Sequence, residues 1–142
     1  MARGLVSTAS TTIDAPIAKV WDALVNPAMI KQYMFGTEVV SDWREGSPIV
    51  WRGDYQGKPY ADKGVILRLQ PQRELQYTHF SPLSGKPDQP ENYHTVTLAL
   101  SRQGAATTVS LAQDNNPDEE AREETTKVWR GMLDALKGLL QQ

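Results

Sequence analysis

The sequence predicts an α+β fold of the helix-grip type, in which a curved antiparallel sheet of about seven strands wraps around one long C-terminal helix. In the last stretch, Asp118 to Leu140, apolar residues recur at helical spacing over an arc about 160° wide, broader than the ~100° stripe of an ordinary surface helix. Residues 36–111 alternate apolar and polar side chains with a period of two, and short turns separate the alternating runs. So wide an apolar arc requires a sheet that curves around the helix.

The N-terminal part of the chain predicts one strand and two short helices. Residues 4–13 are small, β-branched and polar, as in a strand. After Pro16, apolar residues recur at the spacing of an amphipathic helix: Ile17, Val20, Trp21 and Leu24. Asn26 and Pro27 end this helix and provide the cap and first position of a second short helix, which runs to about Tyr33.

The alternating region predicts about six strands, and the only long link between them is residues 82–91. In the strand near residue 65, we expect Val65, Leu67 and Leu69 to share the inner face. The residues expected to point toward the long helix are Trp51, Tyr55, Leu67, Tyr77, His79, His94, Val96 and Leu98.

The long helix has a marked start and two predicted functions along its inner face. Asn116 is expected to be the N-cap, with Pro117 at the first helical position and Glu119 completing a capping box. Two leucines near the end, Leu139 and Leu140, are expected to seal the core. Positions earlier in the helix are expected to face a ligand: Val128, Trp129 and Met132.

Length and composition limit the classes of function. A chain of 142 residues is long enough for one domain, 1–142, with a sizeable core. The net charge of −2 and the lack of a basic stripe argue against a nucleic-acid partner. There is no apolar run long enough to span a membrane and no signal-peptide core, so we expect a cytoplasmic protein with no membrane partner. The absence of cysteine excludes disulfides and thiolate metal sites.

The run IDAPIAKVWDALVNPAMIKQY resembles the opening of the SRPBCC (START/Bet v 1-like) superfamily, and more narrowly the branch named for homology to the activator of Hsp90 ATPase. The matching features are Ala15-Pro16, Val20-Trp21, Ala23-Leu24 and Asn26-Pro27. The ending VWRGMLDALKGLL resembles the final helix of that branch, a tryptophan followed by spaced leucines. These are packing and capping signals, so the resemblance implies the fold more than the function. The superfamily includes lipid carriers, hormone receptors, cyclases and co-chaperones.

A cavity between the long helix and the concave sheet is the predicted binding site, and a completely filled core is the alternative. We predict that it binds a hydrophobic or amphipathic small molecule without catalysis, with no cofactor and no metal ion. The predicted ligand-binding residues are Met34, Phe35, Trp51, Tyr55, Tyr77, His79, His94, Val128, Trp129 and Met132.

The two histidines of the chain, His79 and His94, flank the proline-rich segment at the ends of adjacent predicted strands. They are interpreted as a metal pair with Asp88 or Glu91, as a general acid–base pair at the cavity mouth, or as hydrogen-bonded structural residues. Our hypothesis places them at the polar end of the pocket.

Three further features have two interpretations each. Residues 81–91 are either a gate over the cavity or a stiff connection. Met34 and Phe35 either form the opposite rim or plug the core. Gly131 and Gly138 align on the polar side of the long helix, either in the groove of a homodimer or as tolerated surface glycines of a monomer.

Three other functions compete with simple binding. A cyclase or hydrolase would use a cavity histidine or tyrosine as acid and base. A co-chaperone would act on an Hsp90-type ATPase through its outer surface, although this chain has no room for the extra N-terminal domain of full-length activators. A stress-response or regulatory domain would need no small ligand.

Overall fold

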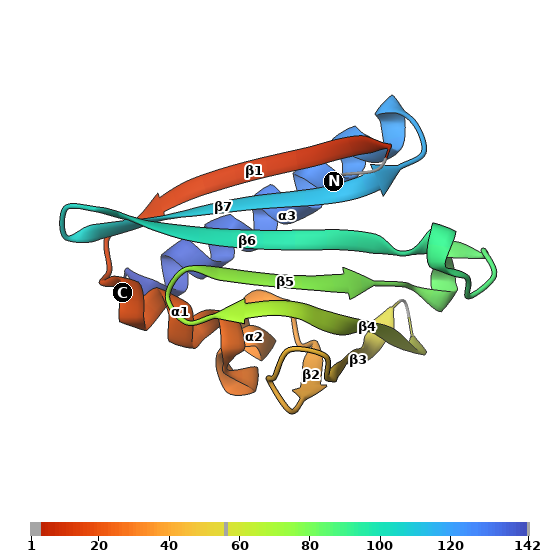
Figure 1. Ribbon diagram of the computed structural model, residues 1–142, viewed down its shortest axis with the longest axis horizontal. Coiled ribbons are helices and arrows are strands. Elements are labelled where there is room, and N and C mark those ends of the chain that lie inside the picture. The colour runs from red at the N-terminus through yellow and green to blue at the C-terminus, as the bar shows by residue number, and fades with distance from the viewer. Residues whose placement is uncertain (1–3, 56, 142) are drawn as a thin grey trace.

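The computed structural model describes residues 4–55 and 57–141, without the side chain of Tyr55. Its elements follow the predicted order (Figure 1): β1 (Leu5–Ile13), α1 (Ile17–Val25), α2 (Pro27–Tyr33), β2 (Glu38–Ser41), β3 (Pro48–Tyr55), β4 (Lys58–Gln70), β5 (Glu74–His79), the 3-10 turns η1 (Pro82–Ser84) and η2 (Pro90–Asn92), β6 (His94–Gln103), β7 (Ala106–Asn116) and α3 (Glu119–Leu140). None of the described helices is long and apolar enough to cross a membrane.

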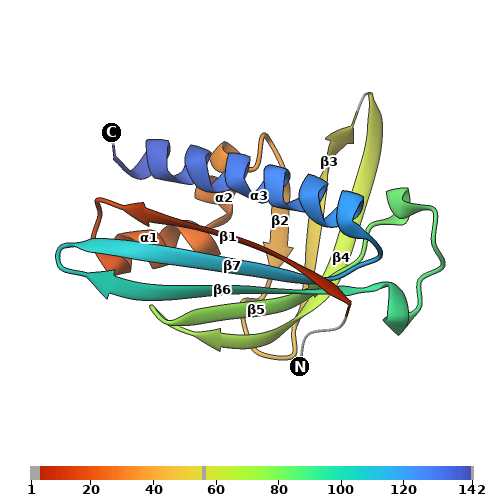
Figure 2. The same cartoon turned by 90° about the horizontal axis from the view of Figure 1, so that it is seen from above.

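The seven strands form one antiparallel sheet in the order β1-β7-β6-β5-β4-β3-β2. The strands from β2 to β7 follow one another as a meander, and β1 pairs with β7, from Leu5 opposite Asn116 to Ile13 opposite Thr107. The sheet curves beneath α3, and α1 and α2 lie below its C-terminal half (Figure 2). The predicted α+β helix-grip fold is confirmed.

The wide apolar arc of α3 is covered at one end only. Its C-terminal half contributes Leu133, Leu136 and Leu140 to the buried core. Toward the N-terminus Trp129 is only partly buried against this core, and the side chain of Val128 is 60% exposed. The core therefore lies where α1 and α2 meet α3, and the first half of α3 faces a less filled region.

The predicted start of α3 is wrong by two residues. Asp118 is the N-cap, and its Oδ1 accepts a hydrogen bond of 2.8 Å from the amide of Ala121. Asn116 instead ends β7: its buried Nδ2 donates to the carbonyl oxygen of Leu5 at 2.9 Å, and its Oδ1 accepts from Thr125 Oγ1 at 3.1 Å. Because this amide joins β1 and α3 to β7, it is not available to cap the helix or complete a capping box.

The predicted inner face of β4 is also wrong near residue 65. Ile66 is fully buried, whereas Val65 is exposed and Leu67 is 46% exposed on the outer face. The pairing of β4 with β5 shifts between Ile66 and Arg68, and such a bulge reverses the alternation of side chains. This shift returns Leu69 to the core, so the predicted inward direction holds for Leu69 and fails for Leu67.

Two glycines provide a test of this backbone arrangement. A Cβ at Gly64 would lie 1.7 Å from the carbonyl oxygen of Thr78, whereas a Cβ at Gly131 would meet nothing within 4 Å. We expect Gly64→Ala to lower the free energy of unfolding by about 3 kcal/mol, because the strands must separate. Gly131→Ala should raise it by about 1 kcal/mol, because alanine favours a helix interior.

Urea unfolding of both variants beside the native protein measures these effects. A tolerated Gly64→Ala would contradict the close approach of β4 and β5. A destabilising Gly131→Ala would contradict an exposed glycine on α3 and favour a packed contact there.

Candidate functional site

A cavity of about 640 Å³ lies between the first half of α3 and the inner face of the sheet. Apolar and aromatic side chains make up most of its wall: Met34, Phe35, Trp51, Tyr77, Leu83, Val96, Val128, Trp129 and Met132. Polar residues from five elements and the segment after α2 complete it: Thr37, Asp54, Tyr60, Asp62, His79, Gln113, Glu124 and Thr125. The structure therefore brings most of the predicted ligand-binding residues to one cavity.

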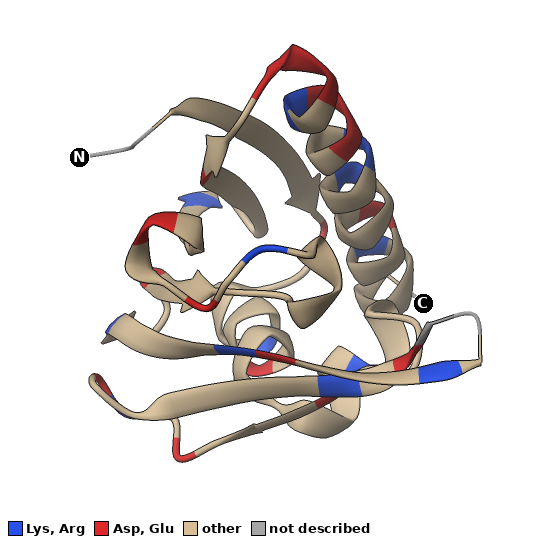
Figure 3. Cartoon of the chain, turned by 90° about the vertical axis from the view of Figure 1, so that its right-hand side faces the viewer, with Lys and Arg blue, Asp and Glu red and all other residues tan. Residues whose placement is uncertain are grey.

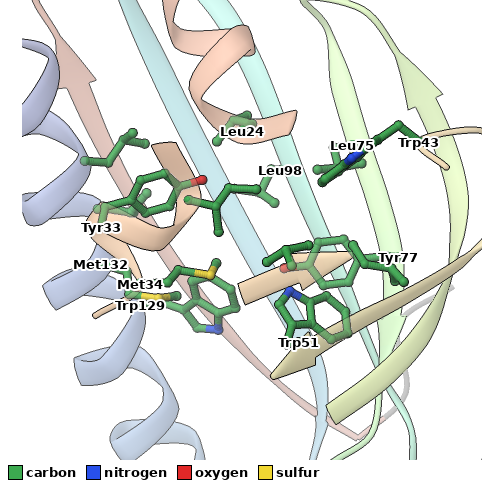
Figure 4. A pocket seen from close by; sticks show the side chains of 15 residues that line it. Leu24, Tyr33, Met34, Trp43, Trp51, Leu75, Tyr77, Leu98, Trp129 and Met132 are labelled. Atoms are coloured by element: carbon green, nitrogen blue, oxygen red, sulfur yellow. The ribbon is translucent and has the colours of Figure 1, made fainter. Parts of the chain in front are cut away.

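A second, much smaller void of about 30 Å³ lies deeper in the core. Figure 4 shows its wall, which includes Leu24, Tyr33 and Leu98. Five residues line both spaces: Met34, Trp51, Tyr77, Trp129 and Met132. The inner void is too small for an organic ligand, so the interior is packed at one end of α3 and hollow at the other.

Aromatic rings from β3, β5 and α3 are fixed in the cavity wall. Trp129 Nε1 donates a hydrogen bond of 2.7 Å to Gln113 Oε1, which holds the indole of α3 against β7. The ring centroid of Trp51 lies 5.0 Å from that of Tyr77 and 5.0 Å from that of His79. The rings are inclined to one another, by 48° for Trp51 and Tyr77 and by 64° for Trp51 and His79, and these contacts preorganise an aromatic wall in the cavity.

His79 is bonded to an acidic residue that the sequence did not indicate. Its Nε2 lies 2.9 Å from Asp62 Oδ2, and among the described residues neither His79 Nδ1 nor Asp62 Oδ1 has a hydrogen-bond partner, although both atoms are buried. A proton on Nδ1 would be a buried donor without an acceptor, so the neutral ring with its proton on Nε2 fits best. The Asp62 carboxylate then accepts a hydrogen bond from His79 Nε2–H.

Asp62 could have been found from the strand pairing. It lies directly opposite Trp51 in the ladder of β3 and β4, and paired residues point to the same face. The residues of β4 that share this face are spaced by two: Tyr60, Asp62, Gly64 and Ile66. Because one is acidic and one is glycine, the sequence does not show the apolar alternation of an inner face.

His94 lies beside His79 but does not line the large cavity. The two ring centroids are 6.4 Å apart, and both rings border a separate polar pocket of about 110 Å³. His94 Nδ1 donates to the carbonyl oxygen of Asp114 at 2.8 Å. Burial lowers the pKa of His94, and the neighbouring His79 lowers it further, against the opposing effect of the Asp114 carbonyl. This geometry fits the structural interpretation of the pair.

Of the two acidic residues proposed as metal ligands with the histidines, Asp88 has a carboxylate that is engaged by other partners. Asp88 forms an ion pair with Lys63 and accepts a hydrogen bond of 2.6 Å from the Tyr93 hydroxyl. The main-chain oxygen of Glu91 accepts a hydrogen bond of 2.8 Å from Asn115 Nδ2. In the part of the chain that the structure describes, no three His, Asp or Glu residues are grouped as they would be around a metal ion.

The same contacts hold residues 81–91 in place. Besides the bonds of Asp88, the rings of Phe80 and Tyr93 stack with centroids 5.1 Å apart. This network favours the stiff connection over the gate. Leu83 in η1 is nevertheless 54% exposed at the cavity.

The mouth of the cavity is apolar and exposed. Phe35, Leu83 and Val128 lie at it, and Phe35 is 76% exposed. Phe35 has a φ of 55°, in the left-handed region that glycine favours, because it follows the last turn of α2. Met34, in contrast, packs partly against the core. Met34 therefore contacts the core, and Phe35 forms the rim.

Two tyrosines, Tyr77 and Tyr55, also belong to the predicted ligand-binding residues. Tyr77 is buried in the wall of both spaces, and burial raises the pKa of its hydroxyl well above the usual value. The side chain of Tyr55 lies outside the described residues.

The lowered pKa of His94 predicts a loss of stability in mild acid. The unfolded chain takes up a proton near pH 6.5, whereas the folded protein takes it up only at lower pH. Stability is therefore complete above about pH 6.5 and falls as the pH drops through the folded-state value. In urea unfolding at about pH 7.5 and about pH 5, we expect the native protein to lose more stability than His94→Gln. An equal loss in the two proteins would contradict this assignment.

Comparisons with known proteins agree with this architecture. The family model described as Activator of Hsp90 ATPase homolog 1-like protein matches residues 14–141. A solved protein of Cytophaga hutchinsonii is 54% identical, with a TM-score of 0.86 over 99% of this chain and 96% of that one. A comparison with the curated proteins gives no match.

More distant structures share the fold. A protein of Chromobacterium violaceum is 21% identical, with a TM-score of 0.78 over 96% of this chain and 97% of that one. The Aha1 dimer from Colwellia psychrerythraea is 17% identical, with a TM-score of 0.76 over 96% of each chain. The branch that the N-terminal run resembles is thus confirmed, and the chain belongs to the family of Activator of Hsp90 ATPase homolog 1-like proteins.

Proposed function

We propose that this protein binds a hydrophobic or amphipathic small molecule in the cavity between α3 and the sheet, without converting it. The observation that supports this most strongly is the cavity itself. Its volume of about 640 Å³ falls in the range of small-molecule sites, and its wall is mostly aromatic and aliphatic. The adjoining core contains a void of only about 30 Å³, so in the described part of the interior, open space of this size is confined to the cavity beside the first half of α3.

The exposed rim provides the driving force for binding. Phe35, Leu83 and Val128 expose apolar side chains to water at the mouth. A ligand that covers them removes this apolar area from solvent, which contributes about 2.5 kcal/mol for each ~100 Å² buried. The fixed rings of Trp51 and Trp129 lose little conformational freedom when the ligand arrives.

The titratable groups in the wall favour binding over catalysis. An acid–base histidine must exchange a proton with the substrate through an accessible nitrogen. In His79 one nitrogen is bonded to Asp62 and the other is buried. The raised pKa of Tyr77 keeps its hydroxyl protonated at neutral pH, so it is a poor base.

Replacing the exposed rim residue tests the proposal. Phe35→Gly should keep or raise the stability by about 1 kcal/mol, because glycine accepts the left-handed conformation without strain. The same change should weaken binding of the neutral fluorescent probe N-phenyl-1-naphthylamine about tenfold, because an aromatic contact is lost. Fluorescence titration measures the affinity, and urea unfolding measures the stability.

Leu67→Ala is the matched control. Leu67 is a partly exposed apolar residue on the outer face of β4, so its truncation should leave probe binding unchanged. A probe that fails to bind the native protein, or binds Phe35→Gly equally well, would contradict the proposed site.

A further inference from the structure

The charged residues in the cavity wall are all acidic. They are Asp54, Asp62 and Glu124, and no lysine or arginine occurs among the described residues that line the space. Glu124 is an exposed residue at the mouth, where it pairs with Lys127 at 3.5 Å. Asp54 is exposed near the end of β3. Asp62 is different, because its side chain is only 15% exposed and it faces inward beside Trp51.

Asp62 has no lysine or arginine partner among the described residues, and its ion-pair partner is His79, which carries a charge only when protonated. Its described hydrogen-bond partner is His79, which is best satisfied as the neutral ring because its other nitrogen is buried without an acceptor. Asp62 Oδ1 is buried and accepts no hydrogen bond from the described residues. A largely buried carboxylate with one unsatisfied oxygen is costly unless a donor of opposite charge approaches it.

Aromatic residues lie next to this carboxylate: Trp51 is opposite Asp62 in the strand ladder, and the ring of His79 bonds it. The centroid of Trp51 lies 5.0 Å from that of His79, and Tyr60, on the same strand face as Asp62, hydrogen-bonds Thr37 through its hydroxyl at 3.1 Å. Aromatic faces attract cations through the negative charge of their π-systems. A carboxylate within an aromatic cavity is therefore suited to a cation and unsuited to an anion.

The first turn of α3 is also acidic, with Glu119 and Glu120 (Figure 3), and Glu119 pairs with Arg122. This half of the helix forms one side of the cavity. An acidic approach attracts cationic molecules and repels anionic ones.

From these observations we infer that the ligand has a positively charged amino group, which Asp62 receives, and an apolar body that lies against Trp51, Trp129 and Met132. This inference rests on the proposed binding function and specifies the chemical class of its ligand. The charge-assisted hydrogen bond satisfies the second oxygen of Asp62, and the rest of the molecule fills the apolar part of the cavity.

Three compounds with the same apolar body separate the contribution of charge from that of burial. Calorimetric titration near neutral pH would compare 4-phenylbutylamine, 4-phenylbutan-1-ol and 4-phenylbutanoate. A hydrogen bond to a charged group contributes about 1.5–3 kcal/mol, so we expect the amine to bind about tenfold or more tightly than the alcohol. The carboxylate should bind most weakly.

Asp62→Asn removes the charge and keeps a side-chain oxygen that accepts the hydrogen bond from His79. We expect it to abolish the preference for the amine and to leave binding of the alcohol within about threefold. Asp134→Asn removes the same charge from the exposed side of α3 and should retain the preference.

The outcomes distinguish the two proposals. If the alcohol binds and the amine binds no better, or if Asp62→Asn retains the preference, the inference is wrong and the proposed function stands. If none of the three compounds binds while N-phenyl-1-naphthylamine does, the inference is wrong and the proposed function stands. If that probe also fails to bind the native protein, both proposals fail.

Discussion

The architecture depends on one mismatch: the apolar face of α3 is longer than the core that can cover it. Leu133, Leu136 and Leu140 are buried in the core, in the half of α3 that lies near α1 and α2 (Figure 2). Beyond them the apolar face continues through Met132, Trp129 and Val128, which reach the cavity. The hydrophobic effect therefore fixes one half of the helix and leaves the other half available to a ligand.

The position of α3 is fixed at its first half by polar contacts rather than by apolar packing. The buried amide of Asn116 bonds the main chain of β1 and the side chain of Thr125 on α3. The hydroxyl of Ser7 on β1 donates to the carbonyl oxygen of Arg122 at 2.9 Å. Buried hydrogen bonds of this kind are costly to break, so the hollow end of α3 keeps its place without a filled core beneath it.

Most of the fold could be predicted because it follows from local patterns. The period of two in the strands, the spacing of Ile17 to Leu24 and the leucines of α3 each identify an element. Trp51, Trp129 and Met132 were predicted to lie on inner faces, and the structure places them in the cavity wall. These predictions needed only the direction of each side chain relative to its own element.

The errors arise where distant residues decide the structure. Asn116 and Asp118 are both good helix caps in sequence, and the choice between them depends on Leu5 and Ser7, more than 100 residues away. The face of β4 depends on the close approach of Gly64 to Thr78. The same close approach places Ile66 inside and Leu67 outside. Asp62 was not predicted as a site residue, because its position in the wall depends on pairing with Trp51.

The four tryptophans provide the most direct test that the hollow half of α3 is the binding site. Trp51 and Trp129 line the large cavity, whereas Trp21 lies on α1 and lines neither space. The indole N–H signals of ¹⁵N-labelled protein, assigned with single Trp→Phe variants, can be followed while N-phenyl-1-naphthylamine is added. The signals of Trp51 and Trp129 should shift together with one dissociation constant, and that of Trp21 should stay in place. A shift of the Trp21 signal while the other two remain fixed would contradict this account.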